Sequence, residues 1–229
     1  MTKRPYTAAI IAAGGSSVRC GSDKLEFLLG GETVLARVLH VFDTCGDIDE
    51  IVVVTRPDRV SMLSESVAAQ GLNKPCRVVA GGSTRTESVR SGAAAVSPQT
   101  EILCIHDGAR PFVTHDLITR TIAAAVRVGA ATAAVPEKYT VKVADADGMV
   151  LATPPRETLW EIQTPQCFSR GLYMRASEHA EQATDDCVLF ERMGYPVQLV
   201  RGEERNIKIT APEDLLVARA FWEAYGQCE

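Results

Sequence analysis

Glycines, hydroxyls and positive charges are concentrated between residues 12 and 24, directly after a short apolar segment. The residues of interest in this stretch are Gly14, Gly15, Gly21, Ser16, Ser17, Arg19 and Lys24. Glycines let backbone N–H groups approach an anion closely, while hydroxyls and cations add further donors and charge. The combination is typical of a phosphate-binding loop. A turn between a strand and a helix, with two solvated cations, is the structural alternative, and this loop alone does not distinguish the two.

Two well-known phosphate-binding loops do not fit this stretch. A Walker A loop needs Gly-x-x-x-x-Gly-Lys-Ser/Thr, but Gly15 and Gly21 are one residue too far apart and Ser22-Asp23 follow them. A dinucleotide-binding fold needs an acidic residue at the end of its second strand, but the expected strand there ends in Thr55-Arg56. The loop is therefore expected to bind a nucleoside triphosphate in another way.

A carboxylate and a guanidinium follow a second apolar segment, Ile102–Ile105. Asp107 and Arg110 would lie at the carboxyl end of a buried strand, and these residue types suit metal binding and phosphate recognition. The alternative is that the two side chains merely pair with each other. His106 is interpreted as structural, because a neighbouring aspartate and a strand end do not make a histidine a base.

A further glycine- and hydroxyl-rich turn, Gly81–Val89, precedes a helix expected to end near Val96. Free N–H groups at a helix start favour anionic ligands. The structural alternative is a capping box, with Ser83 or Thr84 as N-cap and Glu87 as its partner, which leaves the paired glycines unexplained.

Apolar segments of strand length alternate with segments of helical periodicity along the whole chain. This pattern predicts a single doubly wound, mostly parallel, Rossmann-like α/β sheet. The expected strands are residues 8–13, 51–55, 76–80, 102–105, 131–136, 197–200 and 206–210. The expected helices are residues 34–43, 59–69, 115–128, 171–182 and 185–193, one ending near 96 and one beginning at 212. Residues 163–166, Gln-Thr-Pro-Gln, are expected to form an ordered loop.

The pattern breaks at residues 137–158, where two short strand-like segments flank Asp147-Gly148, a pair suited to a tight turn. No helix is available to cover this hairpin. A two-stranded ribbon alone is marginal in water, so we expect it to be a dimerisation arm that packs on a second copy of the chain.

Composition limits the class of protein. The chain has 229 residues, of which 46% are hydrophobic and 23% are charged, so residues 1–229 are expected to form one domain with a substantial core. The net charge of −5 argues against broad nucleic-acid binding. The seven cysteines are spaced far apart and are expected to be reduced, and no apolar run has bilayer length, so we expect a cytoplasmic protein with no membrane partner.

Together these motifs resemble the 2-C-methyl-D-erythritol 4-phosphate cytidylyltransferase family, and they follow the family's order along nearly the whole chain. The matching segments are Ala-Ala-Gly at 12–14 with Arg19 and Lys24, Gly-Gly-x-x-Arg-x-x-Ser-Val at 81–89, His-Asp-Gly-Ala-Arg-Pro at 106–111, Thr140, Arg156, Gln-Thr-Pro-Gln at 163–166, Thr184-Asp185 and Asn-Ile-Lys-Ile-Thr at 206–210. The first loop departs from the family pattern, since four residues separate Gly14 from Arg19 and Ser16 occupies a usual glycine position. Ser83 stands where many members have a carboxylate.

The resemblance implies a reaction in which CTP and methylerythritol phosphate give CDP-methylerythritol and pyrophosphate, with Mg²⁺ as the cofactor and a homodimer as the assembly. By this resemblance the CTP site comprises Ala12, Ala13, Gly14, Gly15, Gly82, Ser88 and Asp107. Arg19 and Lys24 would hold the triphosphate, and Asp107 would also be the metal ligand. The polyol-phosphate site would comprise Arg110, Thr140, Arg156, Thr164, Thr184, Lys208 and Thr210. The catalytic residues would be Arg19, Lys24, Lys208 and Arg156, with Thr140 and Arg156 reaching in from the partner's arm.

Two other functions stay open at this point. A ribitol 5-phosphate cytidylyltransferase shares the fold and most motifs, although Ala-Ala-Gly at 12–14 and Leu-Trp before Gln163 favour the methylerythritol enzyme. A nucleotide-binding regulator without turnover is the third reading. The presence of cations for both substrates argues against it, because a sensor need not keep both halves of a transfer site.

Overall fold

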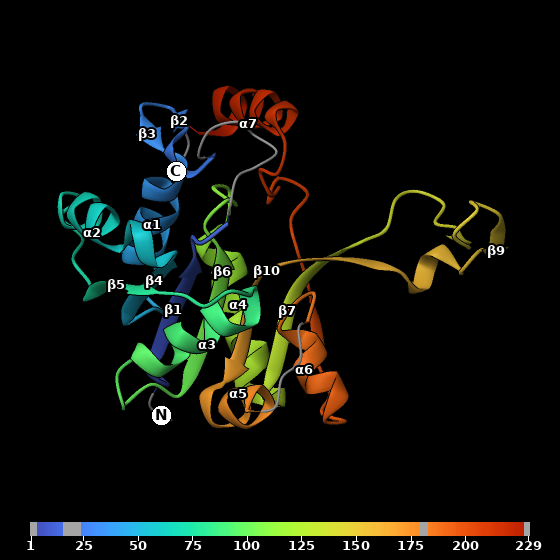
Figure 1. Ribbon diagram of the computed structural model, residues 1–229, viewed down its shortest axis with the longest axis horizontal. Coiled ribbons are helices and arrows are strands. Elements are labelled where there is room, and N and C mark those ends of the chain that lie inside the picture. The colour runs from blue at the N-terminus through green and yellow to red at the C-terminus, as the bar shows by residue number, and fades with distance from the viewer. Residues whose placement is uncertain (1–3, 16–23, 179–182, 227–229) are drawn as a thin grey trace.

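A seven-stranded sheet forms the centre of the computed structural model, which describes residues 4–15, 24–178 and 183–226 (Figure 1). Its strands, in spatial order, are β5 (Cys76–Ala80), β4 (Glu50–Thr55), β1 (Thr7–Ala12), β6 (Ile102–Asp107), β10 (Trp160–Ser169), β7 (Ala130–Pro136) and β11 (Gln198–Arg201). The strand β10 is antiparallel to both of its neighbours, and the other pairings are parallel. The predicted mostly parallel α/β sheet is therefore confirmed.

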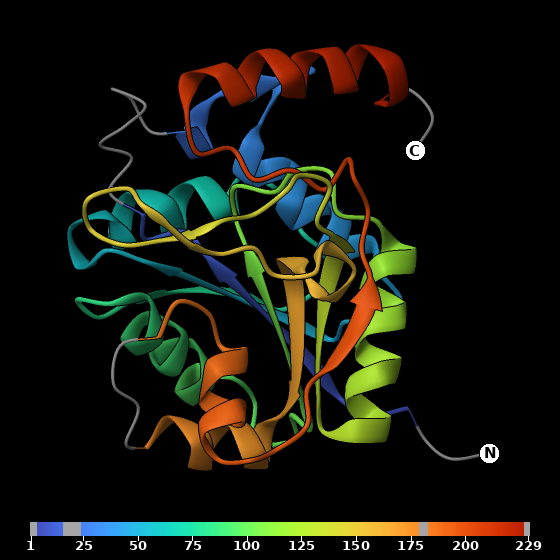
Figure 2. The ribbon, with the colours of Figure 1, turned by 90° about the vertical axis from the view of Figure 1, so that its right-hand side faces the viewer.

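Helices cover both faces of this sheet (Figures 1 and 2). One face carries α1 (Val34–Thr44), α2 (Val60–Ala68) and α4 (His115–Val128), and the other carries α3 (Arg85–Ala95), α5 (Arg170–Ser177) and α6 (Cys187–Arg192). The last helix, α7 (Pro212–Tyr225), lies beyond the carboxyl ends of the strands, with Ala218 buried in the core on the α1 side (Figures 1 and 2). The chain also forms short 3₁₀ turns at Lys24–Glu26, Pro57–Arg59 and Arg156–Thr158, and a small ribbon of β2 (Leu28–Leu29) and β3 (Glu32–Thr33). None of the described helices is long and apolar enough to cross a membrane.

The alternation of side chains along β1 explains how one strand supports two cores. Ala9 and Ile11 are buried against the α1 and α4 face, whereas Ala8 and Ile10 are buried against the α3 and α5 face. Successive side chains of a strand point to opposite faces, so a strand covered on both sides reads as a continuous apolar run. This is why the segment before Gly14 contains no polar residue after Thr7.

The order of the strands changes direction between β1 and β6. From β1 the chain passes through α1 to β4 on one side, and from β5 it returns through α3 to β6 on the other side. The two strand ends are joined where the N–H of Gly108 donates to the carbonyl of Ala12 at 3.0 Å. In an open α/β sheet, the carboxyl ends of the strands at such a reversal form the ligand-binding crevice.

The hairpin arm extends from the body of the molecule (Figure 1). Its strands, β8 (Val143–Ala144) and β9 (Val150–Ala152), are shorter than the sequence pattern suggests. The turn between them is closed by Asp145, whose carboxylate accepts from the N–H groups of Asp147 and Met149, and Gly148 has a positive φ of 83°. The predicted tight turn is thus confirmed.

Two predicted elements are wrong. Residues 163–166 are not a loop but the middle of β10, where the pairing to β7 shifts between Ile162 and Gln166 around a cis Thr164–Pro165 bond. An irregularity of this kind accommodates a proline inside a sheet. Residues 206–210 are not a strand: the segment is held by the N–H of Ile209, which donates to the carbonyl of Ala109 at 2.9 Å, and by burial of the Ile209 side chain.

The cysteines within the described ranges are free thiols. Cys45, Cys104, Cys167 and Cys187 are buried, and Cys76 is half-buried. Burial raises the pKa of the Cys76 thiol to about 11. Cys20 and Cys228 lie outside the described residues. The expected reduced state holds for the thiols that the structure describes.

Candidate active site

A cavity of about 240 Å³ opens at the carboxyl ends of β1 and β6. Several parts of the chain line it: the loop after β1, the turn at Lys24, the end of β4, the loop before α3 with its first turn, and the segments around Asp107 and Lys208. The lining residues are Ala12, Ala13, Gly14, Gly15, Lys24, Leu25, Val54, Gly82, Ser83, Thr84, Arg85, Ser88, Asp107, Ala109 and Lys208. The cavity thus brings together the described residues expected in the nucleotide site, together with Lys24 and Lys208.

The first loop is anchored across the end of β4. The N–H of Ala13 donates to the carbonyl of Val54 at 2.7 Å, and the hydroxyl of Thr55 donates to the carbonyl of Ala13 at 3.2 Å. Gly14 passes over the backbone of Thr55 and Arg56. These contacts direct the glycines into the cavity wall. Arg19, the other cation expected in this loop, lies outside the described residues.

Lys24 lies on the cavity wall at the start of a 3₁₀ turn. Its charge also acts on Asp214, near the start of α7. Burial acts to raise the pKa of the Asp214 carboxyl, but hydrogen bonds from Thr210 and Ala211, together with the charge of Lys24, hold it below its ordinary value. The start of α7 is therefore close enough to the cavity for its carboxylate, Asp214, to interact with the charge of Lys24.

The turn before α3 is a capping box, as the structural alternative predicted. Thr84 is the N-cap and accepts from the N–H of Glu87 at 3.1 Å, while Glu87 accepts from the N–H of Thr84 at 3.2 Å and from the N–H of Ser83 at 2.7 Å. The box also explains the paired glycines. A Cβ at Gly82 would lie 2.4 Å from the Cβ of Glu87, and one at Gly81 would lie 2.5 Å from the hydroxyl of Ser88. Only glycine fits beside this cap, and the cap places Gly82 and Ser88 at the cavity.

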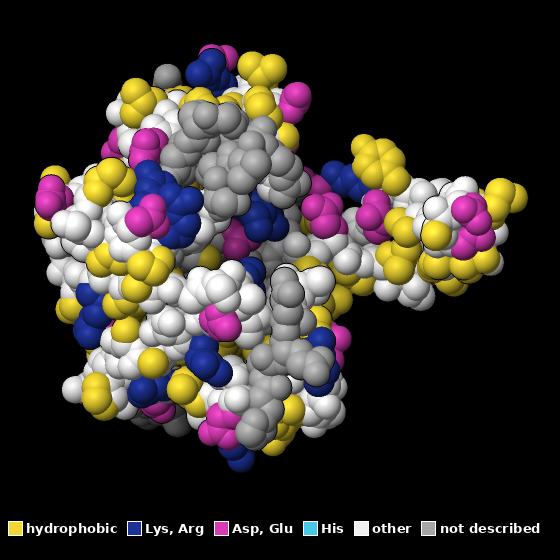
Figure 3. Space-filling model, in the orientation of Figure 1, with side chains coloured by type: hydrophobic (Ala, Val, Ile, Leu, Met, Phe, Trp, Pro, Cys, Tyr) yellow, Lys and Arg dark blue, Asp and Glu magenta, His cyan; other side chains and the backbone are white. Residues whose placement is uncertain are grey.

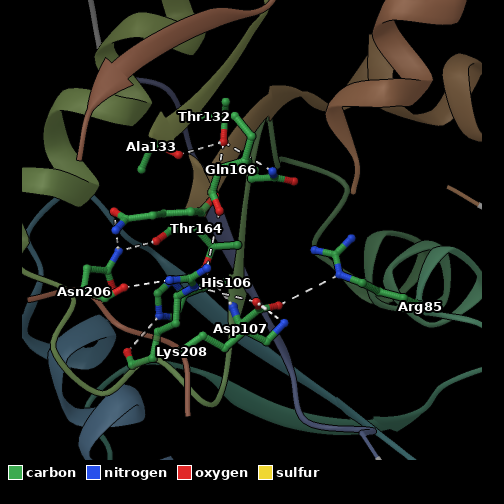
Figure 4. Close-up of polar contacts among 12 residues, drawn as sticks. Arg85, His106, Asp107, Thr132, Ala133, Thr164, Gln166, Asn206 and Lys208 are labelled. Carbon is green, nitrogen blue, oxygen red and sulfur yellow. Dashed lines mark hydrogen bonds and ion pairs between the residues drawn. The ribbon is translucent and has the colours of Figure 1, made fainter. Parts of the chain in front are cut away.

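Asp107 is the centre of the charged part of the site (Figure 4). It ends β6, and its carboxylate is nearly buried. The ammonium of Lys208 lies 2.8 Å from its Oδ2, the Nε of Arg110 lies 3.8 Å from the same oxygen, and the Nε of Arg85 lies 3.9 Å from Oδ1. Only the lysine is within hydrogen-bonding distance, so the two guanidiniums act mainly through their charge.

These three cations decide the ionisation of Asp107. Burial acts to raise its pKa, but Lys208, Arg85 and Arg110 outweigh burial and hold the pKa of Asp107 at about 2. The group is therefore a carboxylate at neutral pH and cannot act as a general acid there. Lys208, Arg85 and Arg110 outnumber Asp107 and Asp186, the second carboxylate that pairs with Arg85, so this part of the site attracts anionic substrates.

His106 is buried directly behind Asp107 and has a structural role, as expected. The hydroxyl of Thr164 accepts from the N–H of Asp107 at 3.1 Å and lies 2.9 Å from Nδ1 of His106, so Thr164 donates to that nitrogen. The Nε2–H of His106 then donates to the carbonyl of Arg110 at 3.2 Å. Burial lowers the pKa of His106 to about 4, so the ring is neutral at pH 7.

Arg110 ties the loop after β6 to the segment that carries Lys208. One guanidinium nitrogen donates to the carbonyl of Asn206 at 2.7 Å, and the side chain is buried. Burial lowers the pKa of Arg110 although Asp107 opposes that effect. The simple Asp107–Arg110 pair considered from the sequence is therefore a secondary contact, because the closest acceptor of this guanidinium is backbone.

Several residues expected at the polyol-phosphate site lie outside the cavity lining. Thr140 and Arg156 are exposed on the arm, where Arg156 donates to the carbonyl of Lys138 at 3.3 Å. Thr184 is exposed just before α6. Thr164 is buried in the His106 network, and Thr210 donates its hydroxyl to Asp214 at 2.7 Å. Within this single chain the arm residues do not meet the cavity.

Arg85 is a site residue that the sequence reasoning did not assign. It lines the cavity, faces Asp107, and is the first residue of α3. The available signal was its place in the segment Gly-Gly-x-x-Arg at 81–85.

Comparisons with known proteins agree with this geometry. A family model described as 2-C-methyl-D-erythritol 4-phosphate cytidylyltransferase matches residues 7–224. A protein of that name from Caldanaerobacter subterraneus is 44% identical over 221 residues, which cover 93% of this chain and 97% of the relative.

Solved structures give the same result. A 4-diphosphocytidyl-2C-methyl-D-erythritol synthase from Anaerococcus prevotii superposes with a TM-score of 0.86 at 35% identity, covering 96% of this chain and all of that one. A 2-C-methyl-D-erythritol 4-phosphate cytidylyltransferase from Thermus thermophilus gives a TM-score of 0.76 at 32% identity, with 95% and 99% of the two chains covered. The match over nearly the full length, in sequence and in structure, shows that this chain belongs to the 2-C-methyl-D-erythritol 4-phosphate cytidylyltransferase family.

Proposed function

We propose that this chain transfers the cytidylyl group of CTP to 2-C-methyl-D-erythritol 4-phosphate, giving CDP-methylerythritol and pyrophosphate. Membership of the family supports the reaction. The observation that carries it is the position of Asp107, which lies between Lys208 and Arg85 at the cavity formed by the glycine loop and the start of α3.

The chemistry requires positioning and charge compensation. A phosphate oxygen of the polyol phosphate attacks the α-phosphorus of CTP in line with the departing pyrophosphate, and the bond to pyrophosphate breaks as the new P–O bond forms. The attacking phosphate is already ionised at neutral pH, so neither a covalent nucleophile nor a general base is needed. Lys24 and Arg19 would neutralise the triphosphate, and Lys208 with the partner's arm residues would neutralise the acceptor phosphate.

The residues present fit a magnesium ion that arrives with the triphosphate. Within the described ranges no three His, Cys, Asp or Glu side chains could hold a metal together. Mg²⁺ in nucleotide sites is commonly bound by one or two carboxylates plus substrate phosphates and water, and the ionised Asp107 supplies one such carboxylate. When bound, the ion would add positive charge at the phosphates, and Asp107 would hold it there.

We also propose that two copies associate through the arm at residues 137–158. The arm exposes a set of apolar side chains, Tyr139, Val143, Met149, Val150 and Leu151, which Figure 3 shows as hydrophobic surface on the projection. An isolated two-stranded ribbon with this surface is expected to be covered. A partner would then complete the polyol-phosphate site with Thr140 and Arg156.

Free buried thiols support a reducing, cytoplasmic location for this single-domain enzyme.

The substrate is tested by supplying magnesium, CTP and one polyol phosphate at a time to the purified protein and measuring pyrophosphate. Release with 2-C-methyl-D-erythritol 4-phosphate supports the proposal. Release only with ribitol 5-phosphate identifies the alternative transferase. No release with either compound, despite CTP binding, identifies a regulator.

A further inference from the structure

The half-buried Arg85 forms an ion pair with the buried Asp186 beside the cavity. A terminal guanidinium nitrogen of Arg85 lies 2.5 Å from Oδ2 of Asp186, whose side chain is only 1% exposed. The other carboxylate oxygen accepts from the hydroxyl of Tyr173 at 2.9 Å, and the N–H of Asp186 donates to the side-chain oxygen of Gln166 at 3.2 Å. These three partners of Asp186 lie on α3, α5 and β10, so hydrogen bonds from three elements fix its position.

The opposite edge of the same guanidinium faces the site. The Nε of Arg85 lies 3.9 Å from Oδ1 of Asp107, and Figure 4 shows the side chain reaching from α3 toward that carboxylate. A guanidinium is a planar fork and can contact different groups along its two edges. Arg85 therefore connects Asp186, outside the cavity, with Asp107, on its wall.

The pair joins two segments that the family resemblance assigns to different substrates. Arg85 follows Gly82 and the N-cap Thr84 on the nucleotide side, whereas Asp186 lies two residues after Thr184 on the polyol-phosphate side. Residues 184–186 are about a hundred positions from the loop before α3 in the sequence, so contacts in the folded chain must hold the two segments together. The strong contact between them is this charge-assisted hydrogen bond.

We propose that Arg85 and Asp186 are positioning residues whose ion pair holds the Thr184–Asp186 segment against the Gly82–Arg85 segment, so that the acceptor phosphate meets CTP in line. This inference rests on the proposed function for the identity of the acceptor. The pair contacts neither reacting atom. It fixes the distance between the two half-sites, and displacements of about 1 Å are enough to slow such a reaction markedly.

Kinetics of Asp186→Asn test the inference, because asparagine keeps the shape and removes the charge. We expect the KM for the polyol phosphate to rise about tenfold while the KM for CTP changes less than about twofold. Thr184→Ala should give a similar rise. The double variant should be no worse than either single variant, since both disturb the same contact. An unchanged KM, or effects that simply multiply in the double variant, would overturn the proposal.

A matched control separates positioning from general stability. Glu50 is equally buried and pairs with Arg77 at 3.1 Å, but it begins β4 at the opposite end of the sheet from the cavity. Glu50→Gln should lower the melting temperature without changing either KM. If Asp186→Asn does not fold, Arg85→Gln replaces it, with Arg85→Lys expected to recover part of the polyol-phosphate affinity.

Amide hydrogen exchange makes the test independent of the reaction. In Asp186→Asn, the amides of residues 184–192 should exchange faster than in the wild type. In Glu50→Gln, the same amides should exchange as they do in the wild type. Unchanged exchange in residues 184–192 would show that the Arg85–Asp186 ion pair does not hold this segment, whatever the substrate is. If the wild type fails to use methylerythritol phosphate but Asp186→Asn still exchanges faster than the wild type, the proposed function is overturned and the positioning role of the ion pair is supported.

Discussion

The ammonium of Lys208 lies 2.8 Å from the carboxylate of Asp107, although the two residues come from distant parts of the chain. The segment that carries Lys208 is fixed by the bond from Arg110 to the carbonyl of Asn206 and by burial of Ile209. Lys208 is thus held at the edge of the cavity with its charge only partly neutralised. A phosphate approaching from the polyol side would share this ammonium with Asp107.

Lys208→Ala is expected to weaken chiefly the use of the acceptor. A hydrogen bond to a charged group contributes about 1.5–3 kcal/mol, so the KM for the polyol phosphate should rise roughly 10- to 100-fold. The KM for CTP should change much less. Steady-state pyrophosphate release, with each substrate varied in turn, measures both values. A rise confined to the KM for CTP would assign Lys208 to the nucleotide instead.

Lys24→Ala should lower turnover, because the charge on the triphosphate increases in the transition state. Loss of one such contact costs roughly 10²–10³ in kcat. Arg127→Ala provides a matched control, since this exposed cation lies on α4 and donates to Ala123 and Gln198 away from the cavity. Its turnover should equal that of the wild type. Normal turnover in Lys24→Ala would remove that residue from the site.

The stability of the protein should fall as the pH is lowered from about 6.5 to about 4, in part because of His106. The folded state holds the pKa of His106 at about 4, below its ordinary value of 6.5, because burial disfavours the charged ring. In this interval the unfolded chain binds more protons, so protonation favours unfolding by about 1.4 kcal/mol per pH unit, or roughly 3 kcal/mol in all.

Urea unfolding at several pH values, for the wild type and for His106→Gln, measures this contribution. The variant should be less stable at pH 7 and should show a shallower loss of stability between pH 6.5 and 4. Parallel pH profiles for the two proteins would show that His106 does not titrate as its burial implies.

Much of this site could be predicted from the sequence because its parts follow strand ends. Apolar runs identified β1 and β6, and the residues after them had to meet at the carboxyl edge of a parallel sheet. Lys24, Asp107 and Lys208 were found in this way and by family resemblance, and all three line the cavity.

The remaining features depend on contacts that a local pattern does not show. Polar and apolar residues alternate along Asn206–Thr210, a pattern typical of a half-buried strand. The segment is half-buried, because Ile209 lies in the core, but it does not pair with a strand. Pro165 suggested a loop, whereas the sheet accommodates it at a shift in pairing. Arg85 acquires its role from Asp186, a partner about a hundred residues away whose proximity only the fold creates.

Shared sites between two copies can be tested by complementation. A dimer that combines Lys24→Ala in one copy with Arg156→Ala in the other has one intact site and one doubly impaired site. Random mixing should therefore restore about a quarter of wild-type activity from two nearly inactive parents. Formation of the mixed dimer is verified with different affinity tags. A verified mixed dimer without activity would count against a contribution of Arg156 across the interface.

Asp107 lies between two groups of cations, and we expect each group to bind one substrate. The most direct measurement is a crystal structure with magnesium, a non-hydrolysable CTP analogue and the polyol phosphate. We expect Lys24 to contact the triphosphate, and Lys208 to contact the acceptor phosphate beside Asp107. An acceptor phosphate bound away from Lys208, or a triphosphate that leaves Lys24 without contact, would show that the two substrates are not divided between these cations.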